Sequence, residues 1–540
     1  MMFVSQTNIS TERNAMNQFI EKYATHIRGV LTGFDRLVFR GHLRQIVYCK
    51  GLLAYLWDRK VLLKHFGQHV EETSRQIKQA ALKIAEQHQR PSLYLHSSQV
   101  SKEEMAQGIA ARDKIQQGLV CVLSCVEPCM SFAVIRNAAT KELELRSALR
   151  KCLHVYHYWK HPQLGFLHAR LQTWFPFSVQ VGLNGREWLA RTMDQEGMKY
   201  QKQDNCFTWI EDYAQAQKWM DEQLKADWPQ LLHALAEQLN PVHQQIFSHF
   251  PLQYYWSVYQ SEWAMDLCFD PEQLRRLYPK LLRLGMTCFS STDVLRFLGK
   301  KPNLDGQVPA QVTSQVTTDL RRRREGVRIK HFLGANSIKL YDKAYTALTA
   351  VLRPEFTLND PSQFLVYRPK EGGDPQDLQW RTLRRGVADV YRRAQVCQKA
   401  LNRYCDALAS VDDSSTLEEL THPLERRVQW QGQSVRALHP FATADRELLQ
   451  AVNRGEFTLH GFRNSDLRAW LYSTPAASPS EERKRSAAIS RKLRLLRAHG
   501  LIQKLPHTYR YQVTEKGRQI INAVLAARHA TVNHLLAQAA

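Results

Sequence analysis

Alternating polar and apolar residues, the pattern of a half-buried β-strand, recur along the chain and constrain its fold more than any other feature. The pattern predicts strand pairs at Gly29 to Arg44, Gly165 to Gly185 and Gly326 to Phe356. The apolar run GLVCVLSCV, Gly118 to Val126, indicates a buried strand. Helical periodicity appears in ETSRQIKQAALKIAEQHQR and through most of residues 210–300. We therefore expect an α+β protein with a mixed or antiparallel sheet core and a helical middle region.

The length of the chain, 540 residues, exceeds what one ordinary hydrophobic core organises, so we expect three or four domains. The polar stretch KKPNLDGQVPAQVTSQVTTD is typical of a linker. The expected parts are an N-terminal α/β domain at 1–210, a mainly helical region at 211–300, a linker at 301–320, a β-sheet with a basic helix that completes the core at 321–440, and a C-terminal module at 441–540.

Positive charge dominates the composition. The chain has 74 Lys and Arg against 51 Asp and Glu, a formal net charge of +23. A compact chain tolerates this self-repulsion more easily when it binds a polyanion, and nucleic acid is the commonest polyanion. We therefore expect DNA, RNA or both as the partner, the alternative being a basic protein with no such partner. The oligomeric state stays open.

The first residues, MMFVSQTNISTERNAMNQF, have no signal-peptide or transit-peptide layout. The longest apolar run is about half as long as a membrane span. Ten cysteines in a cytosolic chain are expected as thiols. Cys121, Cys125 and Cys129 are spaced four apart, which matches neither a paired zinc motif nor a complete iron–sulfur motif. We expect a cytoplasmic protein without membrane contact.

The last hundred residues contain the clearest module. TADRELLQAVNRGEFTLHGFRNSDLRAWLY predicts two short helices, and SPSEERKRSAAISRKLRLLRAHG predicts a third that ends at Gly500. The phrase LRAHGLIQKLPHTYRYQVTEKGR resembles the recognition-helix end, wing and closing helix of the winged helix-turn-helix family. Between Arg483 and Arg510 there are nine Lys or Arg and no acid. The resemblance implies contact with DNA or RNA; the alternative is a module for protein contacts.

Several cations are candidates for phosphate contacts, since such contacts position a protein on nucleic acid before bases are read. In the C-terminal module they are Arg485, Arg491, Lys492, Arg494, Lys504 and Arg510. Elsewhere they are the run Arg321, Arg322, Arg323 and Arg324, then Lys339, and the basic-helix residues Arg384, Arg385, Arg392 and Arg393.

The stretch RIKHFLGANSIKLYDKAY contains side chains that are suited to catalysis or phosphate binding. Its alternation places Lys339, Tyr341 and Lys343 on one face of a strand. The next predicted strand, TAVLRPEFTL, has Arg353 and Glu355 on one face. If the two strands pair, these side chains meet in one layer.

A tyrosine–aspartate–lysine at a strand end followed by arginine-x-glutamate resembles the core of plasmid and phage rolling-circle replication initiators. The resemblance implies that Tyr341 attacks a DNA phosphodiester, that Glu355 holds a divalent metal such as Mg²⁺ or Mn²⁺, and that Lys339 or Lys343 steadies the phosphate. No histidine–hydrophobe–histidine pair accompanies the stretch, so a sheet that only binds nucleic acid is the alternative.

The whole chain also resembles a group of uncharacterised bacterial proteins that share TWFPF, NGREWL, RIKH and NSIKLYDK. That resemblance implies a mobile-element or plasmid-borne origin and no particular activity. Together, these features favour a bacterial protein that recognises and processes DNA in a replication- or transposition-type system. The first alternative is a non-catalytic partner of a structured RNA or DNA element.

The second alternative is an RNase H-like nuclease. Asp35 in GFDRLVF lies in a predicted strand among apolar residues, and Asp266 lies in EWAMDLCFD. Together with a third acid they would bind Mg²⁺ or Mn²⁺, because metal-dependent nucleases gather acids from distant parts of the sequence. A simpler interpretation is that each acid forms an ion pair, Asp35 with Arg36 or Arg40 for example.

Overall fold

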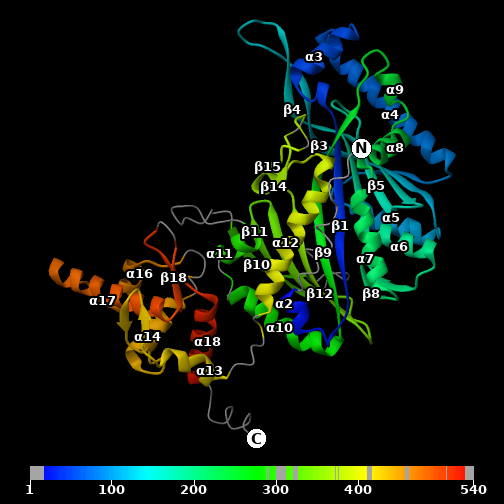
Figure 1. Cartoon of the computed structure of the whole chain (residues 1–540). Coiled ribbons are helices and arrows are strands. Elements are labelled where there is room, and N and C mark those ends of the chain that lie inside the picture. Colours follow the sequence, from blue (N-terminus) through cyan, green and yellow to red (C-terminus); the bar gives the residue numbers. More distant parts are fainter. Residues whose placement is uncertain are drawn as a thin grey trace. The chain divides into compact units, whose positions relative to one another are not determined.

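The computed structural model describes residues 17–287, 289, 291–299, 312–319, 326–370, 372–374, 376–409, 411, 416–454, 457, 461–472, 474–505 and 508–529 (Figure 1). The protein is α+β and divides into two compact units. The first unit combines Met1–His26, Pro271–Asp342 and Lys399–Ala540, and the second combines Ile27–Asp270 and Lys343–Gln398. Each unit is therefore assembled from segments that lie far apart in the sequence.

Eight strands of the second unit pair side by side in the order β13-β9-β1-β6-β5-β4-β3-β2. Their bounds are β1 Ile27–Leu43, β2 Ser92–Leu95, β3 Gly118–Arg136, β4 Leu143–His161, β5 Gly165–Gln172, β6 Val179–Asn184, β9 Tyr254–Phe269 and β13 Ala350–Leu358. Within this run β2 and β3 are parallel and the other neighbours are antiparallel. The expectation of a mixed or antiparallel sheet core is confirmed, although β1 is one long strand where the sequence pattern predicts a strand pair.

Strand β9 corrects the expectation for the middle of the chain. Residues 210–300 were expected to be mostly helical, and they do contain the helices α7 to α11, but Tyr254–Phe269 forms a long strand between β1 and β13. Most of its positions are buried, so the alternation that marks a half-buried strand is weak. Its aromatic and β-branched residues favour a strand.

Helices of the second unit cover both faces of the sheet. They are α3 Cys49–Asp58, α4 Phe66–Gln87, α5 Lys102–Arg112, α6 Gly185–Glu196, α7 Tyr213–Glu222, α8 Trp228–Leu239 and α9 His243–Ile246. Helix α5 packs with Tyr156 and Tyr158, whereas α4 packs with Val155. Because side chains alternate along β4, these two helices lie on opposite faces. Two small hairpins complete the unit: β7 Tyr200–Gln203 with β8 Cys206–Ile210, and β14 Leu365–Arg368 with β15 Gln379–Thr382.

Helix α6 shows how local sequence sets an element. The Asn184 side chain caps it by accepting hydrogen bonds from the backbone N–H groups of Arg186 at 2.8 Å and Glu187 at 3.1 Å. Gly197, with φ of 72°, ends it in the left-handed region that glycine adopts without strain. The helix Gly185–Glu196 therefore begins at a side-chain cap and ends at a glycine.

In the first unit, β10 Val312–Asp319, β11 Gly326–Leu333 and β12 Asn336–Lys343 pair antiparallel. Lys343 itself falls to the second unit. Buried Ile338 and Leu340 alternate with half-buried Lys339 and Tyr341, as the sequence predicts. Strand β10 lies inside the segment expected to be a linker, and residues 301–311 lie outside the described part.

Other helices of the chain are α2 Gln18–Lys22, α10 Pro271–Thr287, α11 Ser291–Phe297 and α12 Val390–Leu408. Helix α12 crosses from the second unit into the first.

The C-terminal part has its own hydrophobic core, which includes Leu448, Leu467, Ile489, Leu493 and Ile520. Its elements are α13 Leu417–Thr421, β16 Val428–Trp430, β17 Gln433–Val435, α14 Thr443–Val452, α16 Asn464–Leu471, α17 Pro479–Ala498, β18 Ile502–Lys504, β19 Tyr511–Val513 and α18 Glu515–His529. The three helices, the hairpin and the closing helix that the sequence predicts are all present. Among the described helices, none combines the length and apolar character that a membrane span requires.

Candidate carboxylate site and cationic surfaces

Asp266 on β9 is held by two arginines. Arg186 Nη2 lies 3.0 Å and Arg353 Nη2 lies 2.9 Å from its Oδ2, and all three residues are fully buried. Arg186 also donates to the carbonyls of Phe34 and Ala264 at 3.2 and 3.1 Å. Burial opposes ionisation of Asp266, but the two guanidinium groups hold its pKa below the ordinary value. The ion-pair interpretation is therefore confirmed for Asp266, and its expected role as a metal ligand has to be corrected.

Three other acids meet on adjacent strands: Asp35 on β1, Glu262 on β9 and Glu355 on β13. One carboxylate oxygen from each lies within 4.8 Å of the others. We call these three residues the carboxylate cluster. Asp35 and Glu355 are the metal-binding candidates of the sequence analysis, and the fold brings them together. Glu262 was missed, although it stands four residues before Asp266 and so on the same face of one strand.

A β-bulge explains how Asp35 and Arg36 both face this cluster. Phe34 pairs with Trp263 and Arg36 pairs with Glu262, so Asp35 is an extra residue without an opposite partner on β9. A bulge breaks the alternation of side chains, and such bulges re-aim residues near functional sites. The side chains of Asp35 and Arg36 therefore both contribute charge to the carboxylate cluster, although the two residues are consecutive in sequence.

Hydrogen bonds fix the Asp35 carboxylate. It accepts from Arg353 Nη1 at 3.2 Å, Asn184 Nδ2 at 3.3 Å and Asn205 Nδ2 at 2.5 Å. Asp35 and Glu355 are buried and Glu262 is half-buried. Three carboxylates this close need positive charge beside them or one of them protonates.

Arg36 and Arg353 supply positive charge at the cluster. Burial lowers the pKa of Arg36, but Glu262, Glu103, Asp35 and Glu355 together raise it above its ordinary value. The cluster is thus a group of oxygen donors whose negative charge two guanidinium groups offset in part. Oxygen donors are the ligands that Mg²⁺ and Mn²⁺ prefer, so these residues could hold such an ion.

The residues expected to act with Glu355 divide between the two units. Tyr341 and Lys339 are half-buried on β12 in the first unit, and Glu355 belongs to the second. Their joint action therefore stays a prediction. Lys343 belongs to the second unit, where its ammonium group donates to Asn205 and lies 3.6 Å from Asp204. Because Asn205 also donates to Asp35, Lys343 is connected to the carboxylate cluster through one amide.

The basic-helix arginines turn out to be partly internal. Arg393 is buried and donates to the Leu358 carbonyl at 3.0 Å and to Ser261 Oγ at 3.3 Å. Burial lowers the pKa of Arg393 to about 10. Its expected contact with nucleic acid is corrected, because the guanidinium holds strands together instead.

The other basic-helix arginines are closer to solvent. Arg384 and Arg392 pair with buried Asp389 at 3.0 and 3.1 Å, and the side chain of Arg385 is 48% exposed. The run Arg321 to Arg324 lies outside the described residues. The contacts expected for these cations stay predictions.

The cations of the C-terminal part differ in their solvent exposure and in their contacts with other side chains. Arg491 and Lys504 are exposed, whereas Lys492, Arg494 and Arg510 are half-buried. Arg485 pairs with Glu481 on the same helix and lies 4.8 Å from the Tyr472 ring centre. Arg494 donates to Gln433. Arg491 and Lys504 are therefore the most accessible of the expected phosphate contacts in the C-terminal part.

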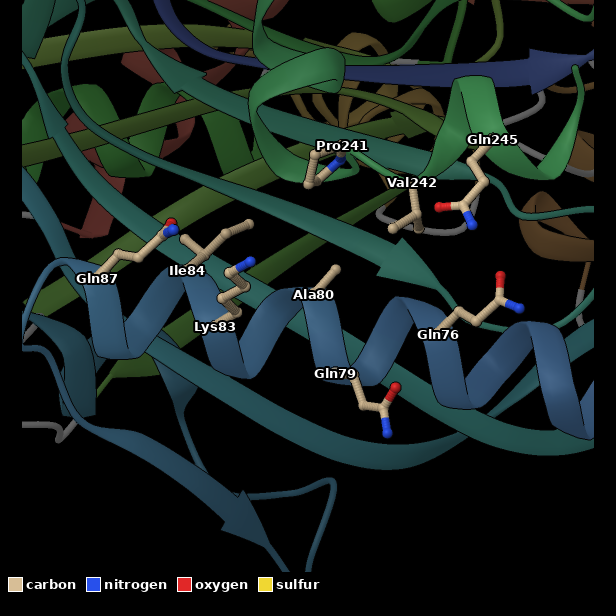
Figure 2. A pocket seen from close by; sticks show the side chains of 9 residues that line it. All are labelled: Gln76, Gln79, Ala80, Lys83, Ile84, Gln87, Pro241, Val242 and Gln245. Carbon is tan, nitrogen blue, oxygen red and sulfur yellow. The ribbon is translucent and has the colours of Figure 1, made fainter.

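A groove of about 560 Å³ lies between α4 and the segment that leads into α9. Figure 2 shows Gln76, Lys83 and Gln87 along α4, with Gln245 extending toward this space from α9. The described residues that line the groove include no acid, histidine or cysteine. Its surface suits hydrogen bonding, and Lys83 is the one titratable side chain among the described residues that line it.

No protein-family model matches the chain, and no curated protein matches it. Among solved structures, the crystal structure of the di-domain ARO/CYC BexL from the BE-7585A biosynthetic pathway is similar over 48% of this chain and 79% of that chain. The sequence identity is 9% and the TM-score is 0.12. At this TM-score the similarity says nothing of fold or function, and the function has to be argued from the residues of this chain.

Proposed function

We propose that this chain binds nucleic acid and that residues 443–529 form a winged helix-turn-helix module that makes the contact. The observation that supports this is the order of elements around one core: α14, a bridge between Phe462 and Tyr511, α16, α17, the hairpin β18–β19 and α18. In helix-turn-helix proteins the later helix of the motif enters the major groove. Here α17 takes that part and β18–β19 forms the wing.

The charge of the module supports the same proposal. Arg483, Lys484 and Arg491 are exposed on α17, while Ile489 and Leu493 of the same helix face the core. Lys504 is exposed at the end of β18. The helix therefore packs through one face and offers cations on another, which is how a recognition helix is held against phosphates.

Salt dependence of binding tests this proposal. Fluorescence anisotropy with labelled duplex DNA, single-stranded DNA and structured RNA would give the affinity at several salt concentrations. If six or more phosphates are neutralised, affinity falls roughly a thousandfold between about 50 and 200 mM salt. No binding at low salt, or an affinity that does not change with salt, would contradict the proposal.

A second candidate function is processing of the bound strand, as in a replication- or transposition-type bacterial system. The observation that favours it is the convergence of Asp35, Glu262 and Glu355 within 4.8 Å. A Mg²⁺ or Mn²⁺ ion held there would polarise a phosphodiester for attack by water or by a tyrosine. Incubation with supercoiled and single-stranded DNA in the presence of either ion tests it. If no substrate is cut, the first alternative, a non-catalytic partner of a structured RNA or DNA element, is favoured.

A further inference from the structure

Two cysteines and a histidine meet on the β3–β4 hairpin, outside the carboxylate cluster. Cys129 on β3, and Cys152 and His154 on β4, bring two sulfurs and a ring nitrogen within 4.8 Å of one another. The pairing register explains this arrangement, because Cys152 lies opposite Glu127 and His154 lies opposite Cys125. Cys129 is therefore the diagonal neighbour of Cys152 on the same face of the sheet.

We infer that Cys129, Cys152 and His154 hold a zinc ion, with water as the fourth ligand. Thiolate sulfur and imidazole nitrogen are preferred zinc ligands, and two cysteines with one histidine and an open position form an established coordination type. Ligand atoms about 2.0 to 2.3 Å from one tetrahedral ion lie about 3.5 to 3.8 Å apart, so atoms within 4.8 Å of one another have to close by at most about 1.3 Å. Magnesium and calcium prefer oxygen ligands, which this group lacks.

A hydrogen bond and a lowered pKa both favour zinc binding by the imidazole of His154. Its Nδ1 lies 3.2 Å from the carbonyl oxygen of Cys152, and the tautomer that donates this bond keeps a lone pair on the other ring nitrogen. A hydrogen bond of this kind orients most metal-binding histidines. Burial, aided by Arg170, lowers the pKa of His154 to about 4, so the ring is neutral near pH 7.

The two sulfurs interact with each other. A hydrogen bond between them lowers the pKa of Cys129 and raises that of Cys152, and the nearby Arg170 and Arg40 also favour the Cys129 thiolate. Zinc binding displaces the thiol protons: the ion takes both sulfurs as thiolates, and the protons that the two sulfurs carried leave to solvent. The oxidation state of sulfur does not change.

The neighbouring acid, Glu127, is bound by other side chains and leaves the fourth coordination position of the zinc ion to water. Glu127 accepts from Tyr156 at 2.7 Å and pairs with Lys102 at 3.0 Å and Arg170 at 2.9 Å. Its carboxylate is thus engaged by three donors. Cys129 is half-buried, so solvent has access to the group from its side.

Metal analysis of the full-length chain tests the inference. After purification without chelators and equilibration with zinc chloride, the wild type is expected to retain about one zinc ion per chain. The variants Cys129→Ser, Cys152→Ser and His154→Gln are expected to lose it. Cys121→Ser is the matched control: Cys121 is buried on the same strand but lies outside the group, and this variant should retain zinc. Circular dichroism confirms that each variant is folded.

Cobalt provides a second readout that does not depend on the stability of the variants. In the wild type, Co²⁺ should give thiolate charge-transfer absorption and the visible bands of a tetrahedral site, and zinc should displace them. The inference is overturned if the wild type binds no zinc, or if Cys129→Ser and Cys152→Ser bind as much as the wild type. It is also overturned if mass spectrometry of alkylated protein shows a Cys129–Cys152 disulfide.

Discussion

Arg353 on β13 and Asp266 on β9 form an ion pair in which both side chains are fully buried and Nη2 lies 2.9 Å from Oδ2. Arg353 also donates to Asp35 at 3.2 Å, so one guanidinium connects the buried pair with the carboxylate cluster. Charges in a medium of low polarity are stable only with their partners. The pair therefore joins β1, β9 and β13 where the candidate site is built.

Replacing Arg353 should destabilise the fold strongly. Arg353→Met leaves the carboxylates of Asp266 and Asp35 without this partner, and breaking a buried pair costs about 3 to 5 kcal/mol of unfolding free energy. Urea denaturation followed by tryptophan fluorescence measures this. Arg28→Ala is the control, because Arg28 and Asp270 form an exposed pair at 2.6 Å, for which we expect a loss below about 1 kcal/mol. Equal losses in the two variants would refute the structural role of Arg353.

Acid should destabilise the zinc-free protein before its carboxylates titrate. Burial lowers the pKa of five histidines from an ordinary 6.5 to about 4: His42, His154, His157, His168 and His331. On unfolding these rings gain protons between the two values. Their contribution to the unfolding free energy is therefore complete above pH 6.5 and is lost as the pH falls toward 4.

His157 offers a specific check of this pH dependence. It is fully buried, and neither ring nitrogen has a hydrogen-bond partner within the described part of the chain. His157→Leu should be tolerated and should reduce the number of protons taken up on unfolding by about one. Urea unfolding at several pH values gives that number from the slope. A slope identical to that of the wild type would contradict the low pKa of His157.

Removing exposed cations from the C-terminal module should weaken nucleic-acid binding in a salt-dependent way. In the double variant Arg491→Ala, Lys504→Ala, the slope of log affinity against log salt should be shallower by about 2. The control is Arg275→Ala, Arg276→Ala, which removes the same charge from an exposed part of α10 beside Glu272. If the control weakens binding as much, net charge and not the module governs the affinity.

Three variants separate the possible cleavage chemistries. Glu355→Gln and Asp35→Asn should abolish any cleavage that requires Mg²⁺ or Mn²⁺ while leaving binding unchanged, because they remove metal ligands and keep side-chain volume. Tyr341→Phe should abolish a covalent protein–DNA adduct if the tyrosine is the nucleophile. Glu103→Gln is the control, since Glu103 is exposed near Arg36 at 3.8 Å but lies outside the cluster. Cleavage that survives both carboxylate variants would exclude the cluster as the active site.

Features set by neighbouring residues could be predicted from the sequence. The capped and glycine-terminated helix α6, the alternation on β12 and the helices and hairpin of the C-terminal part all follow from local periodicity and capping. Asp35 was identified as an acid among apolar strand residues, and Glu355 through the resemblance of its stretch to rolling-circle replication initiators. These signals need no knowledge of which strands pair.

What depends on pairing could not be predicted. Glu262 joins Asp35 and Glu355 only because β9 lies between β1 and β13 in the sheet. Asp266 looked like a metal ligand until the fold brought Arg186 to it from a helix 80 residues away in the sequence. Cys129 meets Cys152 and His154 through the register of β3 and β4, and sequence spacing does not reveal it.

The bulge at Asp35 determines which single-residue deletions β1 could accommodate. Loss of Asp35 alone would make Phe34 and Arg36 consecutive in the ladder, so the pairing of β1 with β9 would become regular there. Loss of any residue between Gly29 and Phe34 would instead shift the register by one residue. Part of the strand would then direct its apolar side chains to the opposite face of the sheet. The irregularity at Asp35 is thus a position where a deletion would leave the ladder regular, and the acid lost with it belongs to the carboxylate cluster.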